Sequence, residues 1–249
     1  MNYWLILGPV GMIIIGLTAI IYWWRKHKVK LRLFTLGGLL WLIAVILKAV
    51  MDALLTTQIY EFLNNSAQLL SVLILSLIVG LRTGLFESGI SYVIIKLRIK
   101  KIKWKESIAV GIGFGASEAL ILGLLNLVTM LVLINPAILT GLSEAERLLV
   151  QSLFNQSTLI VLATWLERGF VLLVHVFATA LVIKAITTKN LNYLWLSIIY
   201  KTIVDLPIPY FQLLISQGDV LITFLTELYV VGAGLAGLYG LKWLKNKKK

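Results

Sequence analysis

The chain has 249 residues, of which 59% are hydrophobic and only 14% are charged, and its mean hydropathy is +0.94. Soluble domains contain about 25% charged residues, so this composition excludes an ordinary soluble protein and favours one embedded in a membrane. The absence of cysteine excludes disulfides and thiolate metal sites. A formal net charge of +12 would suit nucleic acid, but the cations flank long apolar runs instead of forming a basic surface. We therefore expect no nucleic-acid partner.

Seven apolar runs are long enough to cross a bilayer, which takes about 20 helical residues. They predict an all-α, polytopic membrane protein with a single transmembrane domain over residues 1–249, and the lipid bilayer as its surroundings. The expected helices lie near residues 3–24, 33–57, 67–97, 107–135, 158–183, 192–215 and 219–241.

The charges between these runs alternate. Eighteen of the 23 Lys and Arg residues follow the first, third and fifth runs or lie in the C-terminal tail, and the other connections contain most of the acidic loop residues. Cytoplasmic loops are enriched in Lys and Arg. The pattern predicts an N-terminus outside the cell, a cytoplasmic C-terminus and a multi-pass protein of the plasma membrane.

Ionisable residues inside the runs mark candidate functional positions, because charge is costly at bilayer depth. The fifth run contains Glu167, Arg168 and His175, and the last two lie seven residues apart on one helix face. The second run contains Lys48 and Asp52, whose i,i+4 spacing predicts an ion pair within that helix. In the sixth run, two prolines after residue 205 predict a kink or break.

The depth of each ionisable residue, counted from the cytoplasmic helix ends, predicts two polar layers. The inner layer, at about 13–16 Å for a rise of 1.5 Å per residue, contains Glu87, Glu118, His175 and Lys201. The second layer, at about 20–25 Å by the same rise, contains Arg82, Glu167, Arg168 and Asp205. This predicts a polar cavity among the third to sixth helices, with the first, second and seventh packed around them.

The residue types of the inner layer suit hydrolysis. A carboxylate can act as a general base, and an imidazole can orient water or stabilise an oxyanion, so Glu118 or Glu87 with His175 would activate water. A catalytic zinc takes three protein ligands, and if a metal is present those three residues would hold it. Two other interpretations stay open: an ion-coupled or small-solute transporter, and a purely structural network of buried charges.

Four segments resemble motifs of the YhfC family of glutamic-type intramembrane proteases, a distant branch of the CPBP superfamily that includes the type II CAAX prenyl proteases. Gly80-Leu-Arg-Thr-Gly-Leu-Phe-Glu87 is similar to the family's segment of glycines followed by Phe-Glu-Glu. Gly111-Ile-Gly-Phe-Gly-Ala-Ser-Glu118 is similar to its Gly-x-Gly-His-Gly-Gly-x-Glu motif. The Glu-Arg…His…Thr pattern of residues 167–179 and the Lys-x-x-x-Asp of residues 201–205 resemble the other two.

The resemblance implies an intramembrane peptidase, of glutamic or metallo type, that cleaves membrane-associated peptides or proteins. Glu118 would be the general base, Glu87 a second carboxylate, and His175 the group that orients water or stabilises the oxyanion. The supporting polar layer would consist of Glu167, Arg168, Asp205, Lys201 and Arg82.

Three departures from the family pattern bear on catalysis. Ser88 stands where a second Glu is common, and Phe114 and Lys201 each replace a motif histidine. Phe cannot bind water or metal, and Lys repels a cation while it can pair with Glu118 or Glu87. A pseudoprotease that binds or scaffolds membrane segments is therefore the alternative function.

Overall fold

The structure is a computed structural model that describes residues 1–64, 68–98, 102–215 and 220–246. Every regular element in these ranges is helical, and seven helical spans are long and apolar enough to cross a membrane. Helices suit this role because their backbone hydrogen bonds are satisfied within the segment. The predicted all-α class and the number of spans are confirmed.

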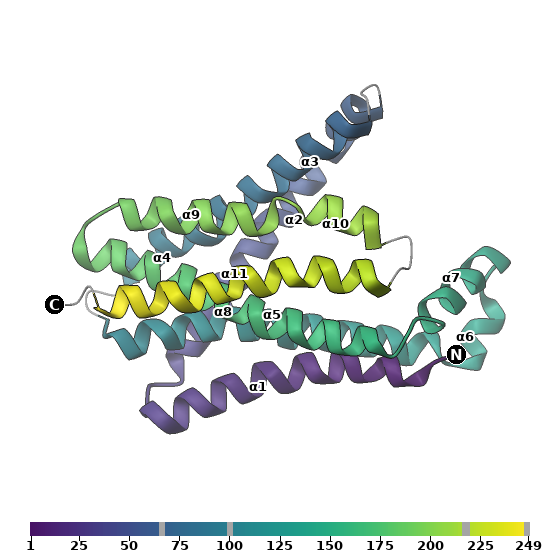
Figure 1. The fold of residues 1–249 in the computed structure, drawn as a ribbon, viewed down its shortest axis with the longest axis horizontal. Coiled ribbons are helices and arrows are strands. Elements are labelled where there is room, and N and C mark those ends of the chain that lie inside the picture. The colour runs from purple at the N-terminus through teal and green to yellow at the C-terminus, as the bar shows by residue number, and fades with distance from the viewer. Residues whose placement is uncertain (65–67, 99–101, 216–219, 247–249) are drawn as a thin grey trace.

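Five spans are single helices: α1 (Leu7–His27, preceded by η1, Tyr3–Ile6), α2 (Arg32–Asn64), α5 (Trp104–Leu133), α8 (Leu159–Thr188) and α11 (Val220–Asn246). The third span consists of α3 (Gln68–Thr83), η2 (Gly84–Ile90) and α4 (Ser91–Arg98), and the sixth of α9 (Asn192–Asp205) and α10 (Ile208–Ile215). Two short helices, α6 (Pro136–Gly141) and α7 (Glu144–Phe154), connect α5 to α8. In Figure 1 the end of α2 and the start of α3 extend beyond the other spans. Both α8 and α11 run past their predicted ends, because hydropathy marks the apolar part of a helix and not its polar last turn.

The centre of the bundle is formed by α5 and α8. α5 packs against α1, α2 and α8, and α8 also packs against α9 and α11. A side chain at Gly113 would lie 2.1 Å from the Phe34 carbonyl oxygen in α2, and one at Gly111 would lie 2.7 Å from Cα of Val176 in α8. Small residues allow such direct contact between helix backbones. The backbones of α2 and α8 therefore both approach α5 closely, shortly before Glu118.

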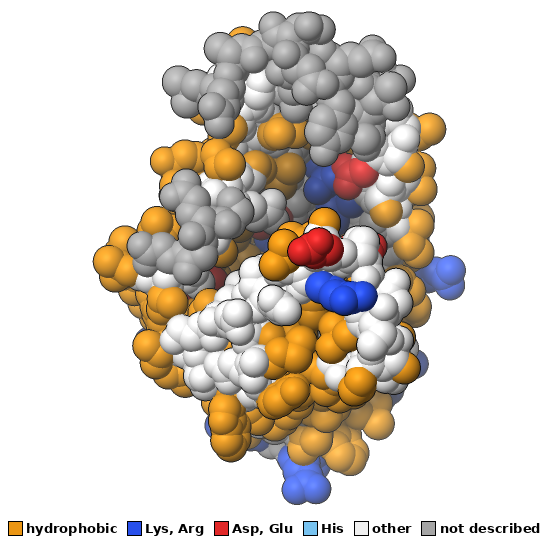
Figure 2. Space-filling view, turned by 90° about the vertical axis from the view of Figure 1, so that its right-hand side faces the viewer, with side chains coloured by type: hydrophobic (Ala, Val, Ile, Leu, Met, Phe, Trp, Pro, Cys, Tyr) orange, Lys and Arg blue, Asp and Glu red, His pale blue; other side chains and the backbone are white. Residues whose placement is uncertain are grey.

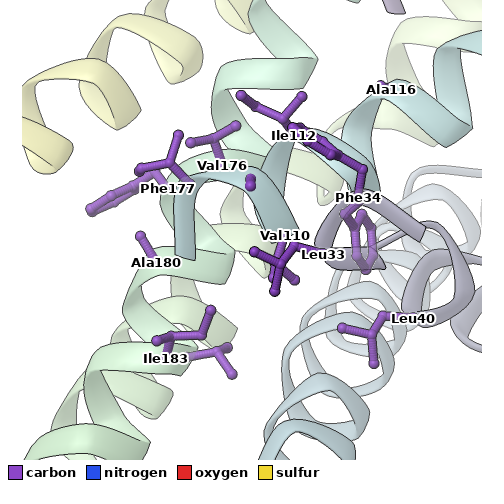
Figure 3. Close-up of a cluster of buried hydrophobic side chains, with 14 of the residues drawn as sticks. Leu33, Phe34, Leu40, Val110, Ile112, Ala116, Val176, Phe177, Ala180 and Ile183 are labelled. Atoms are coloured by element: carbon purple, nitrogen blue, oxygen red, sulfur yellow. The ribbon is translucent and has the colours of Figure 1, made fainter. Parts of the chain in front are cut away.

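Apolar side chains of α2, α5 and α8 fill the space beside this contact. Figure 3 shows them meeting in one cluster, which includes the buried Leu40, Val110 and Ile183. Within a membrane such packing stabilises through van der Waals contact rather than through exclusion of water. Three charged residues of the candidate site, Lys48, Glu118 and Arg168, lie on the same three helices, so the cluster helps to fix their relative positions.

The third span changes its hydrogen-bonding pattern midway. Its central segment, η2, is a π-helix, whereas α3 and α4 on either side are α-helical. Short π-helical segments are rare and frequently occur at functional sites. Glu87 and Ser88 lie in η2 and are both buried. The predicted continuous helix thus contains an irregular segment at its candidate carboxylate.

The sixth span breaks where the prolines predict. Helix α9 ends at Asp205, and α10 begins at Ile208. Pro207 lies between them, and a proline has no N–H to donate and clashes with the carbonyl four residues earlier. The last turn of α9 closes with the Leu206 N–H bonded to the Thr202 carbonyl at 2.9 Å. The predicted break is confirmed.

The connection between α5 and α8 contains an amphipathic helix, α7, with a capping box at its start. The Ser143 backbone N–H donates to the Glu146 carboxylate at 2.8 Å, and the Glu146 N–H donates to the Ser143 hydroxyl at 3.4 Å. This reciprocal pair satisfies two backbone donors at the start of α7. The hydrogen bonds from Ser143 lower the pKa of Glu146 below its ordinary value.

Candidate active site

Glu118, on α5, is held by donors from two neighbouring helices. Trp41 Nε1 on α2 donates to it at 2.9 Å, and on α8 Arg168 Nη1 lies at 2.8 Å and His175 Nε2 at 3.0 Å. A carboxylate offers about four acceptor positions, so one position remains. The Glu118 side chain is 16% exposed. Glu118 is therefore a fixed carboxylate with access to open space.

Glu87, in η2, lies between two ammonium groups. Lys48 Nζ of α2 is 2.7 Å from Oε1, and Lys201 Nζ of α9 is 2.6 Å from Oε2. The side chains of Glu87 and Lys201 are each 4% exposed. The Lys201 pairing is one of the two expected from sequence. Three spans thus share one buried cluster of three charges.

His175 joins the two carboxylates. Its Nδ1 lies 3.1 Å from Lys201 Nζ, and its Nε2 faces Glu118. An ammonium group donates hydrogen bonds and accepts none, so Nδ1 must be the acceptor of this contact. The proton of the neutral imidazole then lies on Nε2 and points at Glu118, an assignment that follows from the hydrogen-bond network. The Phe114 ring stacks on the imidazole with the ring centroids 4.8 Å apart.

Three of the four residues of the second predicted layer separate into two groups, and the fourth, Asp205, lines the cavity described below. Glu167 forms an ion pair with Arg168 and thereby adjoins Glu118. Arg82 instead forms an ion pair with Asp52, where α2 contacts α3. Helix contacts, not depth alone, decide which of these charges meet.

The ion pairs of α2 differ from the one expected within that helix. Lys48 pairs with Glu87 and Asp52 pairs with Arg82, so both pairs connect α2 to the third span. An i,i+4 spacing permits an internal pair, but opposite charges on a neighbouring helix compete for the same groups. The second span is therefore part of the site, which corrects its expected peripheral position.

A cavity of about 520 Å³ lies against these groups. Its charged and aromatic lining consists of Trp41, Lys48, Glu87, Glu118, Glu167, Arg168, His175, Lys201 and Asp205. Apolar residues of α2, α5, α8, α9, α10 and α11, together with Gln212, complete its walls, so it is not confined to the third to sixth spans. Figure 2 faces the end of the molecule where α6 and α7 lie, and acidic and basic side chains are visible there in a hollow.

Sequence reasoning did not assign Trp41 or Lys48 to the site. Trp41 lies in an apolar run with other aromatic and aliphatic residues, and nothing in its surroundings distinguishes it as a hydrogen-bond donor. Lys48 was recognisable as a charge at bilayer depth, and only its partner was assigned wrongly. Ser88, at the position of a common second Glu, contacts the Ser197 hydroxyl at 2.8 Å instead of facing a carboxylate.

The candidate ligands Glu87, Glu118 and His175 do not fit a metal ion. Glu87 approaches Nδ1 of the imidazole and Glu118 approaches Nε2, so the two carboxylates lie at opposite ring nitrogens. Lys201 Nζ also lies between Glu87 and Nδ1. Within the described ranges, no group of three His, Asp or Glu side chains converges as metal ligands do. These three residues are therefore not arranged in this structure as the zinc ligands considered from the sequence.

Comparison with known proteins gives one match. A model of the family described as YhfC intramembrane metalloprotease matches residues 11–230, which include every residue of the site. Neither the search of curated proteins nor the search of solved structures found a match.

Proposed function

Because this chain belongs to the YhfC intramembrane metalloprotease family, we propose that it is a membrane-embedded peptidase that cleaves membrane-associated peptides or proteins. We place it in the plasma membrane with its N-terminus outside and its C-terminus in the cytoplasm, as the distribution of Lys and Arg between the spans favours. The hydrolytic group is Glu118, and the surrounding charges hold it in place.

The observation that carries this proposal is the 3.0 Å contact between Glu118 and His175 at the wall of a cavity of about 520 Å³. A general base has to be held within hydrogen-bonding reach of the proton that it abstracts, and pockets that bind small ligands have volumes of about 300–1,000 Å³. A fixed carboxylate with one remaining acceptor position, beside a space of this size, suits the activation of water.

In the proposed reaction, Glu118 accepts a proton from water as the water oxygen attacks the peptide carbonyl carbon. The proton then passes from Glu118 to the amide nitrogen as the carbon–nitrogen bond breaks. Lys48, which is more exposed than Lys201 at 17% against 4%, lines the cavity and can stabilise the oxyanion. The single N–H of His175 points at Glu118, which supports a positioning role for His175 over the oxyanion role expected from sequence.

A second candidate function is a pseudoprotease that binds membrane segments without cleaving them. It is favoured by the pairing of the site cations, since Arg168, Lys48 and Lys201 all form ion pairs, and by Phe114, which covers one face of the imidazole. A cavity with this lining could hold a peptide segment and lack a reactive group.

Glu118→Gln distinguishes the two functions. The full chain is purified, reconstituted in phospholipid vesicles and supplied with a library of quenched fluorescent hydrophobic peptides. We expect Glu118→Gln to lower the cleavage rate by about 10²–10⁴-fold, the usual contribution of a general base, without loss of the folded state. The matched control is Glu227→Gln, which removes a half-buried intramembrane carboxylate outside the cavity and should leave the rate unchanged. If the wild type and Glu118→Gln bind peptides equally and neither cleaves them, the peptidase proposal is refuted and the pseudoprotease function is supported.

A further inference from the structure

We infer that the Lys201 ammonium takes the place of a metal ion in this chain, so that the site works without a divalent cation. The inference deepens the proposed function and rests on it for the reaction that the site performs. It rests on three observations: the spacing of the groups around Lys201, the occupation of both imidazole nitrogens, and the burial of the ammonium.

Lys201 is a cation shared by two groups that could otherwise bind a metal. Glu87 Oε2 and His175 Nδ1 are 3.7 Å apart, and Lys201 Nζ lies 2.6 Å from the first and 3.1 Å from the second. Two ligands at about 2.0–2.1 Å from a tetrahedral zinc lie roughly 3.3–3.4 Å from each other, so the 3.7 Å separation is wider than that of a zinc-bound pair and accommodates the longer contacts of an ammonium group. The carboxylate and the imidazole are thus arranged as a pair that shares one positive centre, and that centre is the ammonium group.

Neither nitrogen of His175 is free for a metal. Nδ1 accepts the hydrogen bond from Lys201, and Nε2 carries the proton that points at Glu118. A metal at Nδ1 would have to displace the ammonium, and a metal at Nε2 would require loss of the bond to the proposed base. The first rearrangement would separate the buried Lys201 ammonium from its partners, which is strongly unfavourable, and the second would require the metal to replace the Nε2 proton.

The ammonium is also enclosed. Lys201 is buried on α9, which packs against η2 and α8, the elements that carry Glu87 and His175. A divalent cation entering the site would meet this fixed positive charge and that of Lys48 on the same carboxylate. Repulsion between charges a few ångströms apart is large in a medium of low dielectric constant.

Lys201 thereby has a definite task in the proposed reaction. By donating to Nδ1 it selects the imidazole form whose proton lies on Nε2, and this proton holds Glu118 in place. A metal bound to Nδ1 would select the same imidazole form. The Lys201 ammonium thus has the same effect on the imidazole as a metal would, but its charge belongs to the protein chain itself. Lys201 is a positioning residue that acts through His175.

The test measures metal content and cleavage separately. The full chain is incubated with zinc in detergent, desalted and analysed for zinc, and its peptide cleavage is assayed before and after treatment with a chelator. We expect the wild type to hold zinc well below one ion per chain and to lose no cleavage activity on chelation. Lys201→His removes the ammonium and adds a donor beside Glu87 and His175, and should bind about one zinc per chain. The matched control, Lys48→His, adds the same donor beside Glu87 but keeps Lys201, and should bind no more zinc than the wild type.

Stoichiometric zinc in the wild type that is lost in His175→Ala, or loss of wild-type cleavage on chelation, would overturn the inference. Equal zinc binding by the two Lys→His variants would also overturn it. If Lys201→His does not fold, the zinc content and chelation results of the wild type decide alone. Absence of cleavage under all conditions would refute the proposed peptidase, whereas the metal content would still test the role of Lys201.

Discussion

We predict that Glu87→Gln strongly destabilises this protein, although the substitution keeps the shape of the side chain. Gln keeps the size of the side chain but leaves the ammonium groups of Lys48 and Lys201, at 2.7 Å and 2.6 Å, without their shared counter-charge. Removing one partner of a buried ion pair costs about 3–5 kcal/mol. Because the Lys201 side chain is 4% exposed and that of Lys48 is 17% exposed, we assign most of this cost to the Lys201 pair.

The free energy of unfolding is measured by titrating the purified protein with SDS in mixed micelles and following tryptophan fluorescence. Glu167→Gln is the matched control, because the Glu167 side chain is 29% exposed and its partner Arg168 keeps its ion pair with Glu118. We expect this substitution to lower the free energy of unfolding by about 0–1 kcal/mol. Adding Lys48→Met to Glu87→Gln should recover part of the loss, as expected for coupled residues. A cost below about 1 kcal/mol for Glu87→Gln, or one equal to that of Glu167→Gln, would refute the argument from burial.

Three further predictions test other parts of the structure. In ¹⁵N NMR spectra of histidine-labelled protein carrying His27→Gln, the one remaining imidazole, His175, should show a protonated Nε2 and an unprotonated Nδ1; the opposite pattern would contradict the Lys201 contact. Trp41→Phe removes one of the three donors to the Glu118 carboxylate. It should lower the free energy of unfolding, measured by the same SDS titration, by about 1.5–3 kcal/mol, which is the contribution of a hydrogen bond to a charged group. Gly113→Ala places a methyl group 2.1 Å from a backbone oxygen of α2 and should cost about 1–3 kcal/mol, whereas Gly89→Ala meets no neighbouring atom within 4 Å and should not.

The number and type of spans could be predicted because hydropathy over about 20 residues depends only on local sequence. The break near Pro207 and the start of α7 at Ser143 were predictable for the same reason, since proline and a capping box act on neighbouring backbone groups. The family resemblance was also carried by local motifs, and the match over residues 11–230 confirms it.

The partners of the buried charges could not be predicted in the same way. Lys48 and Asp52 satisfy the spacing rule for a pair within one helix, but the rule does not say which neighbouring helix faces them. Counting donors likewise named Glu87, Glu118 and His175 as the ligands of a metal, if one were present. Which imidazole nitrogen each carboxylate approaches is a property of tertiary packing, and it is this property that removes the metal site.

The π-helical turn in the third span has a consequence for how this segment tolerates change. A π turn accommodates one residue more than an α turn, so the part of the helix beyond it is rotated by about 100° relative to a continuous α-helix. That rotation lets one span serve two sets of neighbours: α3 packs against α9 and α10, while α4 packs against α8. Deleting a single residue within Gly84–Ile90 would restore the α-helical phase and turn either α3 or α4 away from its neighbours. We therefore expect this segment to accept substitutions far more readily than a change in its length.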